Sequence, residues 1–153
     1  MPDLTIPVAC PNLLHDWANY LDTKSWDRMP AIFAPKIDLD YSSLGQVKAT
    51  AVEPSVYIDR YSSPSQLGNP EIKSHHFVGA CKWTRESESH IKVVFQIMAV
   101  HRRAPSDGGA AVFATGHGVN TMDFAMIDGE WKIAAIKVGV LFMEGDFDGI
   151  FKA

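Results

Sequence analysis

The first third of the chain has apolar residues at the spacing of an amphipathic helix. In and just after residues 8–20 this apolar set consists of Leu13, Leu14, Trp17 and Leu21. A second short helix is expected over residues 26–33, where Pro35 would end it, and a third over residues 51–61. The first two helices would form a helical hairpin.

After the second helix the pattern changes to the alternation that is typical of β-strands. Residues 36–44 place Ile37, Leu39 and Tyr41 on one buried side, so we expect Tyr41 to point inward. The second half of the chain has four long β-rich runs separated by turn sequences, at about residues 73–84, 90–102, 111–126 and 131–142. Helices followed by antiparallel hairpins predict an α+β domain in which the helices close one face of a curved sheet. A pocket is expected between the helices and the sheet.

Two of the predicted strands are apolar on both faces. In the run at 90–102, Val93 and Phe95 alternate with Val94 and Met98, and the run at 131–142 has the same character. One face would line the pocket. Because the other apolar face must also leave water, we expect the outer face of the sheet to form the interface of a homo-oligomer.

Composition and charge narrow the class of function. With 153 residues, 46% of them hydrophobic, the chain is expected to form a single domain over residues 1–153. The formal net charge is −4 and the Lys and Arg residues form no basic stripe, which argues against a nucleic-acid partner. No apolar run approaches the roughly 20 residues that span a bilayer, and the N-terminus has no leader pattern. We therefore expect a soluble, cytoplasmic protein with no membrane partner.

The polar residues of the predicted strands are the first candidates for chemistry. His75 and His76 lie on opposite faces of their strand, so only one can face inward, and parity alone does not choose between them. His101 lies on an otherwise apolar strand face, and Asn120 shares a face with Gly118, where the missing side chain would leave space for a ligand.

A histidine that acts as an acid and a base needs a carboxylate on its second ring nitrogen, to fix the tautomer and to stabilise the imidazolium. Asp22, at the end of the first predicted helix, is the best-placed carboxylate. An aspartate between two helices can equally be a helix cap, and the two roles can coexist.

The other candidates also have purely structural interpretations. A single histidine on an apolar strand, such as His75 or His117, is more often a satisfied core or interface side chain. A buried Tyr41 usually bonds to backbone, and Asn120 could cap a neighbouring loop. The histidines lack the i, i+4 helical spacing of metal ligands, and nothing resembles a phosphate-cradling Gly-rich loop, so we expect no metal and no cofactor.

Several segments resemble fungal scytalone dehydratases in sequence, order and spacing. They are Asp16-Trp17-Ala18, residues 22–28, residues 37–43, His76-Phe77-Val78-Gly79, Val100-His101-Arg102, residues 127–132 and residues 145–151. The resemblance covers nearly the whole chain. It implies a cone-shaped barrel like those of nuclear transport factor 2 and ketosteroid isomerase, with a curved mixed or antiparallel sheet closed by the N-terminal helices. It also implies a homotrimer that dehydrates reduced naphthol polyketides.

The resemblance assigns a role to each polar candidate. It implies that Asp22 orients His76, that His76 is the base and proton shuttle, and that His101 assists. It further implies that Asn120 bonds a substrate hydroxyl and that Tyr41 helps a water molecule to polarise the substrate carbonyl. The family resemblance therefore selects His76 over His75.

The resemblance extends to the walls of the pocket, with two departures. Phe147 corresponds to an aromatic residue that covers the substrate, and Val138 lies where a pocket proline is usual. A second carbonyl-polarising tyrosine of the family falls at Leu21, and a serine that supports a pocket histidine falls at Gly118. Both changes weaken the carbonyl-binding side, so we expect the natural substrate to differ from scytalone.

The function expected from these observations is a lyase that acts on a polyketide-derived phenolic or cyclic ketone in fungal secondary metabolism. The expected chemistry is removal of a proton next to a carbonyl, formation of an enolate and loss of a β-hydroxyl. A cyclase, isomerase or decarboxylase, including a pericyclic catalyst, would need a similar pocket. The hypothesis from a different class is a non-catalytic ligand-binding module.

Overall fold

The computed structural model describes residues 5–152, which form three α-helices, two short 3-10 helices and seven strands. In chain order they are α1 (Ala9–Thr23), η1 (Met29–Ile32), β1 (Phe33–Asp40), η2 (Ser42–Leu44), β2 (Lys48–Val52), α2 (Pro54–Ser62), β3 (Ile72–Ser87), β4 (His90–Arg103), β5 (Val112–Ile127), β6 (Glu130–Lys137), β7 (Val140–Gly145) and α3 (Phe147–Phe151). The predicted domain extends past this part by residues 1–4 and 153, which lie outside the described residues.

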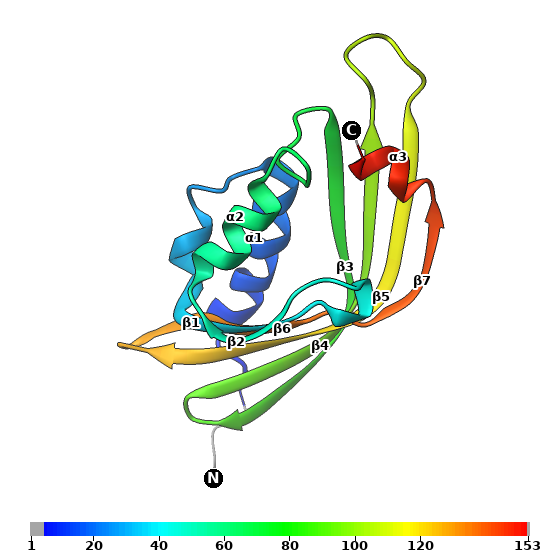
Figure 1. Cartoon of the computed structure of the whole chain (residues 1–153). Helices are drawn as coiled ribbons and strands as arrows, with labels where there is room; N and C mark the ends of the chain where they lie inside the picture. The colour runs from blue at the N-terminus through cyan, green and yellow to red at the C-terminus, as the bar shows by residue number, and fades with distance from the viewer. Residues whose placement is uncertain (1–4, 153) are drawn as a thin grey trace.

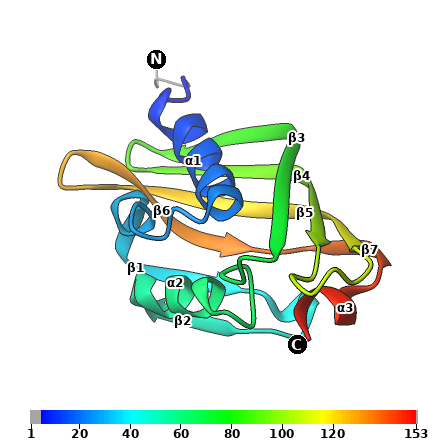
Figure 2. The same ribbon diagram turned by 90° about the horizontal axis from the view of Figure 1, so that it is seen from above.

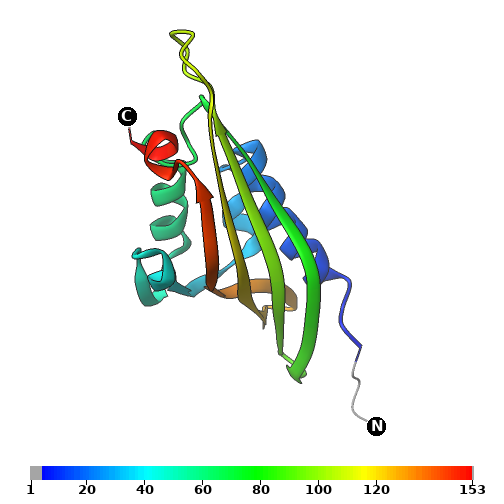
Figure 3. The same cartoon turned by 90° about the vertical axis from the view of Figure 1, so that its right-hand side faces the viewer.

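The sheet has the strand order β2-β1-β6-β5-β4-β3, with β7 paired to β5 beside β6. Strands β1 and β6 are parallel and every other pair is antiparallel, so the predicted mixed, curved α+β sheet is present (Figures 1 and 3). The predicted closure into a cone-shaped barrel is wrong. Strands β2 and β3 are the two ends of the strand order and do not pair with each other, so the sheet stays open.

Helix α1 packs on the sheet because one of its faces is apolar. Its buried residues recur at helical spacing: Cys10, Leu14, Trp17, Ala18 and Leu21. This face contacts β3 and β6, while α2 contacts β1. Figure 2 shows α1 across the β3 side of the sheet and α2 beside β1 and β2. Closure of the sheet by these helices stays a prediction. No helix within residues 5–152 has the length and apolar character needed to cross a membrane.

The predicted helices after α1 need correction. Residues 29–32 form only a 3-10 turn, and strand β1 already begins at Phe33, so the helical hairpin is wrong. The third helix begins at Pro54 instead of 51, because residues 48–52 pair with β1 as strand β2. Here the pairing with a neighbouring strand overrides a local pattern that suits either state.

The last predicted strand is two strands. The chain leaves the ladder after Lys137, where Val138 and Gly139 separate β6 from β7, and both strands then pair with β5. A β-bulge in the β5–β6 ladder also breaks the simple alternation, so that Ile133 and Ile136 are both buried. Phe147 begins the short helix α3, which the sequence pattern did not predict.

Candidate active site

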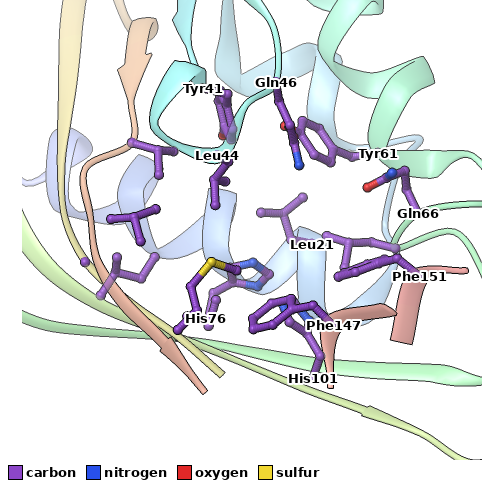
Figure 4. Close-up of a pocket in the computed structure, with 18 of the residues that line it drawn as sticks. Leu21, Tyr41, Leu44, Gln46, Tyr61, Gln66, His76, His101, Phe147 and Phe151 are labelled. Carbon is purple, nitrogen blue, oxygen red and sulfur yellow. The ribbon is translucent and has the colours of Figure 1, made fainter. Parts of the chain in front are cut away.

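A cavity of about 420 Å³ lies between the concave face of the sheet and the helices, within the range of small-molecule sites. Eight of the nine predicted site residues line it: Leu21, Tyr41, His76, His101, Gly118, Asn120, Val138 and Phe147. Figure 4 shows His76 and His101 on one side of the cavity and Tyr41 and Tyr61 on the other. The ninth predicted residue, Asp22, bonds to His76.

His76 is the histidine of the adjacent pair that faces inward. His75 is exposed on the outer face of β3, where its ring contacts Phe77, whereas His76 is half-buried and lines the cavity. The His76 Nδ1 atom lies 2.6 Å from Asp22 Oδ1. Because a carboxylate can only accept, Nδ1 carries the hydrogen and Nε2 keeps its lone pair as the basic atom. This is the arrangement that a proton-abstracting histidine requires.

Asp22 caps no helix, so the capping interpretation is wrong. It lies inside α1, and the residue at the C-cap is Lys24, which adopts the left-handed conformation with φ 56°. The two carboxylate oxygens of Asp22 also accept hydrogen bonds from the backbone N–H of His76, at 2.9 and 3.0 Å. Asp22 therefore joins α1 to β3 and fixes both the position and the tautomer of His76.

His101 lies on β4 beside His76, with 5.9 Å between the ring centroids. Burial, and secondarily the neighbouring His76, lower the pKa of His101 from 6.5 to about 4, so the ring is neutral at pH 7. Its Nδ1 atom lies 2.7 Å from Ser74 Oγ. Ser74 was not predicted as a site residue, although it shares a strand face with His76. The β3–β4 register that places it opposite His101 could not be read from the sequence.

The opposite wall carries three buried tyrosines, of which the sequence analysis singled out only Tyr41. Tyr57 and Tyr61 lie four residues apart on α2. Trp17 Nε1 donates to the Tyr57 hydroxyl at 2.9 Å, and the Tyr41 hydroxyl donates to the same oxygen at 3.2 Å. The Tyr61 hydroxyl donates to Gln46 Oε1 at 2.8 Å. Burial raises the pKa of all three phenols, that of Tyr57 to about 12, so they stay protonated donors.

Asn120 and Gly118 lie on the inner face of β5. The Asn120 side-chain oxygen accepts from the backbone N–H of Gly139 at 3.3 Å, so the predicted loop-capping role is real. That bond leaves the Asn120 amide hydrogens for a ligand. A Cβ at Gly118 would lie 2.5 Å from the Gly139 carbonyl oxygen, so Gly118 is required by the close approach of two backbone segments. A serine could not occupy this position without a backbone shift.

The aromatic side chains of α3 cover the histidine side of the cavity. Phe147 and the unpredicted Phe151 stack on each other at 6.4 Å, and their ring centroids lie 6.2 and 5.3 Å from that of His101. Leu21 and Val138 complete the apolar lining. The cavity is therefore lined largely by apolar side chains, with polar groups at opposite sides.

Two other histidines pair with carboxylates of their own, and one of them, His117, is also among the residues that line the cavity. His117 stacks on Phe142 at 4.2 Å, with its Nε2 atom 3.2 Å from Glu144, and His90 pairs with Asp123 at 2.8 Å. Within residues 5–152 no three His, Cys, Asp or Glu side chains are grouped so that they could hold a metal ion.

Known proteins share both the sequence pattern and the fold. The family model described as scytalone dehydratase matches residues 6–153. The scytalone dehydratase-like protein claB of Passalora fulva is 37% identical over 147 residues, 95% of this chain and 91% of that protein. The scytalone dehydratase of Pyricularia oryzae is 31% identical over 141 residues, 91% and 82% of the two chains.

The fold is shared with a more distant protein of known structure. The crystal structure of the Kfla4162 protein from Kribbella flavida has a TM-score of 0.77, at 15% identity and with 95% of each chain covered.

Proposed function

The chain belongs to the scytalone dehydratase family, and we propose that it is a carbon–oxygen lyase that dehydrates a polyketide-derived phenolic or cyclic ketone in fungal secondary metabolism. The observation that carries the proposal is the 2.6 Å contact between Asp22 and His76 at the wall of a cavity that also holds His101 and Asn120. The proposed ligand is one small molecule, handled in the cytoplasm without a cofactor, a nucleic acid or a membrane.

The first proposed step is proton abstraction by His76. Its Nε2 atom accepts the proton from the carbon next to the substrate carbonyl, and the electrons of the broken C–H bond form the enolate. Asp22 stabilises the resulting imidazolium through Nδ1–H, at a distance typical of a charge-assisted hydrogen bond. The neighbouring His101 is neutral and adds no positive charge beside the imidazolium.

The second proposed step is loss of the β-hydroxyl. The enolate re-forms its carbonyl, the electron pair moves into a new carbon–carbon double bond, and the carbon–oxygen bond breaks. The leaving oxygen takes the proton from His76 Nε2 and departs as water, which returns the histidine to its neutral form. The Asn120 amide is the proposed donor to a substrate hydroxyl, with Tyr41 acting on the carbonyl through a water molecule.

The proposed substrate is a flat, largely apolar ring system that is not scytalone itself. Phe147 and Phe151 offer ring faces for stacking, and Val138 lines the cavity. Leu21, buried in the cavity wall, supplies no hydrogen bond where the family resemblance leads one to expect a tyrosine. A substrate whose carbonyl is bound from another direction suits this wall better.

The test is incubation of the purified protein with scytalone and with hydroxylated tetralones and anthrones, followed by mass spectrometry for loss of water or carbon dioxide. We expect loss of water that falls by about 10² to 10⁴-fold in His76→Ala, the usual contribution of a general acid–base group. His75→Ala, on the outer face of the same strand, is the matched control and should keep its activity. Dehydration that survives His76→Ala would contradict the proposal, and tight binding without turnover would indicate a ligand-binding module.

We also propose that the protein is a homotrimer that associates through the outer face of the sheet. The cross-strand register places four side chains in one row on that face: Phe77 on β3, Met98 on β4, His117 on β5 and Phe142 on β7. Phe77 and Phe142, at the two ends of this row, are 53% and 52% exposed, so the row presents apolar surface to solvent in the single chain. Sedimentation should give a trimer for the native chain and a monomer for Phe77→Glu; a native monomer would contradict this.

A further inference from the structure

The Tyr57 hydroxyl has a surplus hydrogen. Trp17 Nε1–H and the Tyr41 hydroxyl both donate to the Tyr57 oxygen, so two hydrogens fill its two acceptor positions. The hydrogen of Tyr57 itself then has no acceptor among residues 5–152. If the bond between the two tyrosines ran the other way, the Tyr41 hydrogen would be the surplus one. In either case the Trp17 N–H and the two tyrosine hydroxyls together supply three donor hydrogens but form only two hydrogen bonds with each other. One phenol O–H therefore remains for a ligand.

The position of Tyr57 relative to the proposed base makes this hydrogen useful. Trp17 contacts both groups: its ring lies edge-on to that of His76, with 5.9 Å between centroids, and its Nε1 bonds to the Tyr57 hydroxyl. Tyr57, Trp17, Tyr41 and His76 all line the same cavity. A ring ketone whose α-carbon lies against His76 can therefore direct its carbonyl oxygen along the indole towards the Tyr57 hydroxyl.

We propose that Tyr57 donates a hydrogen bond to the substrate carbonyl and holds the oxyanion of the enolate. This inference deepens the proposed function and rests on it. Tyr57 would provide the contact that Leu21 cannot make, from the α2 wall of the cavity instead of from α1.

The two donors to Tyr57 make its hydroxyl a stronger donor. A hydroxyl that accepts hydrogen bonds is polarised, so its own O–H bonds more strongly to an anion. Burial nevertheless keeps the pKa of Tyr57 at about 12, so it gives a hydrogen bond and keeps its proton. The neighbouring Tyr61 differs in this respect, because its hydrogen is already donated to Gln46.

The experiment uses 1-naphthol as a probe of the oxyanion site, because its ionisation is visible by absorbance and needs no turnover. Donors at the site lower the pKa of the bound naphthol. We expect Tyr57→Phe to raise that pKa by about one unit, equivalent to about 1.4 kcal/mol, within the range of a hydrogen bond to a charged group. Tyr20→Phe, the same change at a tyrosine that does not line the cavity, is the control and should leave it unchanged.

Equal shifts in the two variants, or no shift in Tyr57→Phe, would overturn the proposal. If Tyr57→Phe does not fold, 3-fluorotyrosine placed at position 57 keeps the shape and acidifies the phenol, so it should lower the pKa of bound naphthol below the native value. An unchanged or raised value would then count against the inference. The result is independent of the His76→Ala turnover test, so failure of one can be told from failure of the other.

Discussion

The two sides of the cavity control protons in opposite ways. On the histidine side, Asp22 and Ser74 bond to the rings of His76 and His101, and the Asp22 carboxylate, which can only accept, fixes the tautomer of His76. On the tyrosine side, burial raises the pKa of Tyr41 and Tyr57, so these groups donate without ionising. The comparison indicates a division of labour, in which one side moves the proton and the other side holds the negative charge that this creates.

The largest loss of turnover should come from changing Asp22, the carboxylate that orients His76. Asp22→Asn keeps an oxygen that can accept from the His76 backbone, but it removes the charge that stabilises the imidazolium. We expect turnover to fall by about 10⁴-fold, comparable to losing the orienting carboxylate of a catalytic triad, and the unfolding free energy to change by only about 1 kcal/mol.

Steady-state kinetics and urea unfolding would separate these two effects. Asp16→Asn, six residues earlier on α1, is the matched control, because the Asp16 carboxylate pairs with the exposed side chain of His15 and does not line the cavity. A large loss of stability with unchanged turnover would mean that Asp22 mainly ties α1 to β3.

The next effect is the pH dependence of stability that His101 introduces. Its folded-state pKa of about 4 lies below its ordinary value of 6.5, so the unfolded chain binds the proton first as the pH falls. The contribution of neutral His101 to the free energy of unfolding is therefore complete above pH 6.5. It is lost progressively between pH 6.5 and 4, and the loss amounts to about 3 kcal/mol for this group. Urea unfolding at several pH values should show a steeper loss for the native chain than for His101→Gln. Parallel curves would contradict the depressed pKa.

A smaller effect is expected from the hydroxyl that supports His101. Ser74→Ala leaves a buried ring nitrogen without its partner, so we expect turnover to fall by about tenfold, equivalent to about 1.4 kcal/mol. Ser74→Thr keeps a hydroxyl at the same position and should restore most of the activity. If Thr is as poor as Ala, the effect comes from packing, and the hydrogen bond to His101 Nδ1 has no part in it.

The sequence predicted the histidine side better than the tyrosine side. Residue parity together with the family resemblance selected His76, His101 and Asp22, and all three meet in the structure. Tyr57 and Tyr61 were passed over because a helical tyrosine at i, i+4 spacing gives no sign of which wall it will reach. Their role depends on the hydrogen-bond partners Trp17 and Gln46, which lie on other segments.

The predicted fold failed where tertiary pairing decides the local structure. The α+β class, helix α1 and the long strands follow from hydrophobic periodicity. Strand β2 depends on pairing with β1, the preceding strand, and the interruption at Val138 depends on pairing with β5; neither has a clear local pattern. Gly118 was predicted to leave space for a ligand, but its missing side chain makes room for the Gly139 backbone. No local sequence pattern reveals this contact.

The central claim is that His76, held by Asp22, removes a proton next to a carbonyl. The most direct measurement is exchange of the α-hydrogens of 2-tetralone in D₂O by NMR, because this ketone has no leaving group and reports enolate formation alone. The account predicts catalysed exchange by the native protein, a loss of about 10²-fold or more in His76→Ala, and native rates in His75→Ala. Exchange that is equally fast in His76→Ala, or no faster with native protein than without it, would contradict the claim.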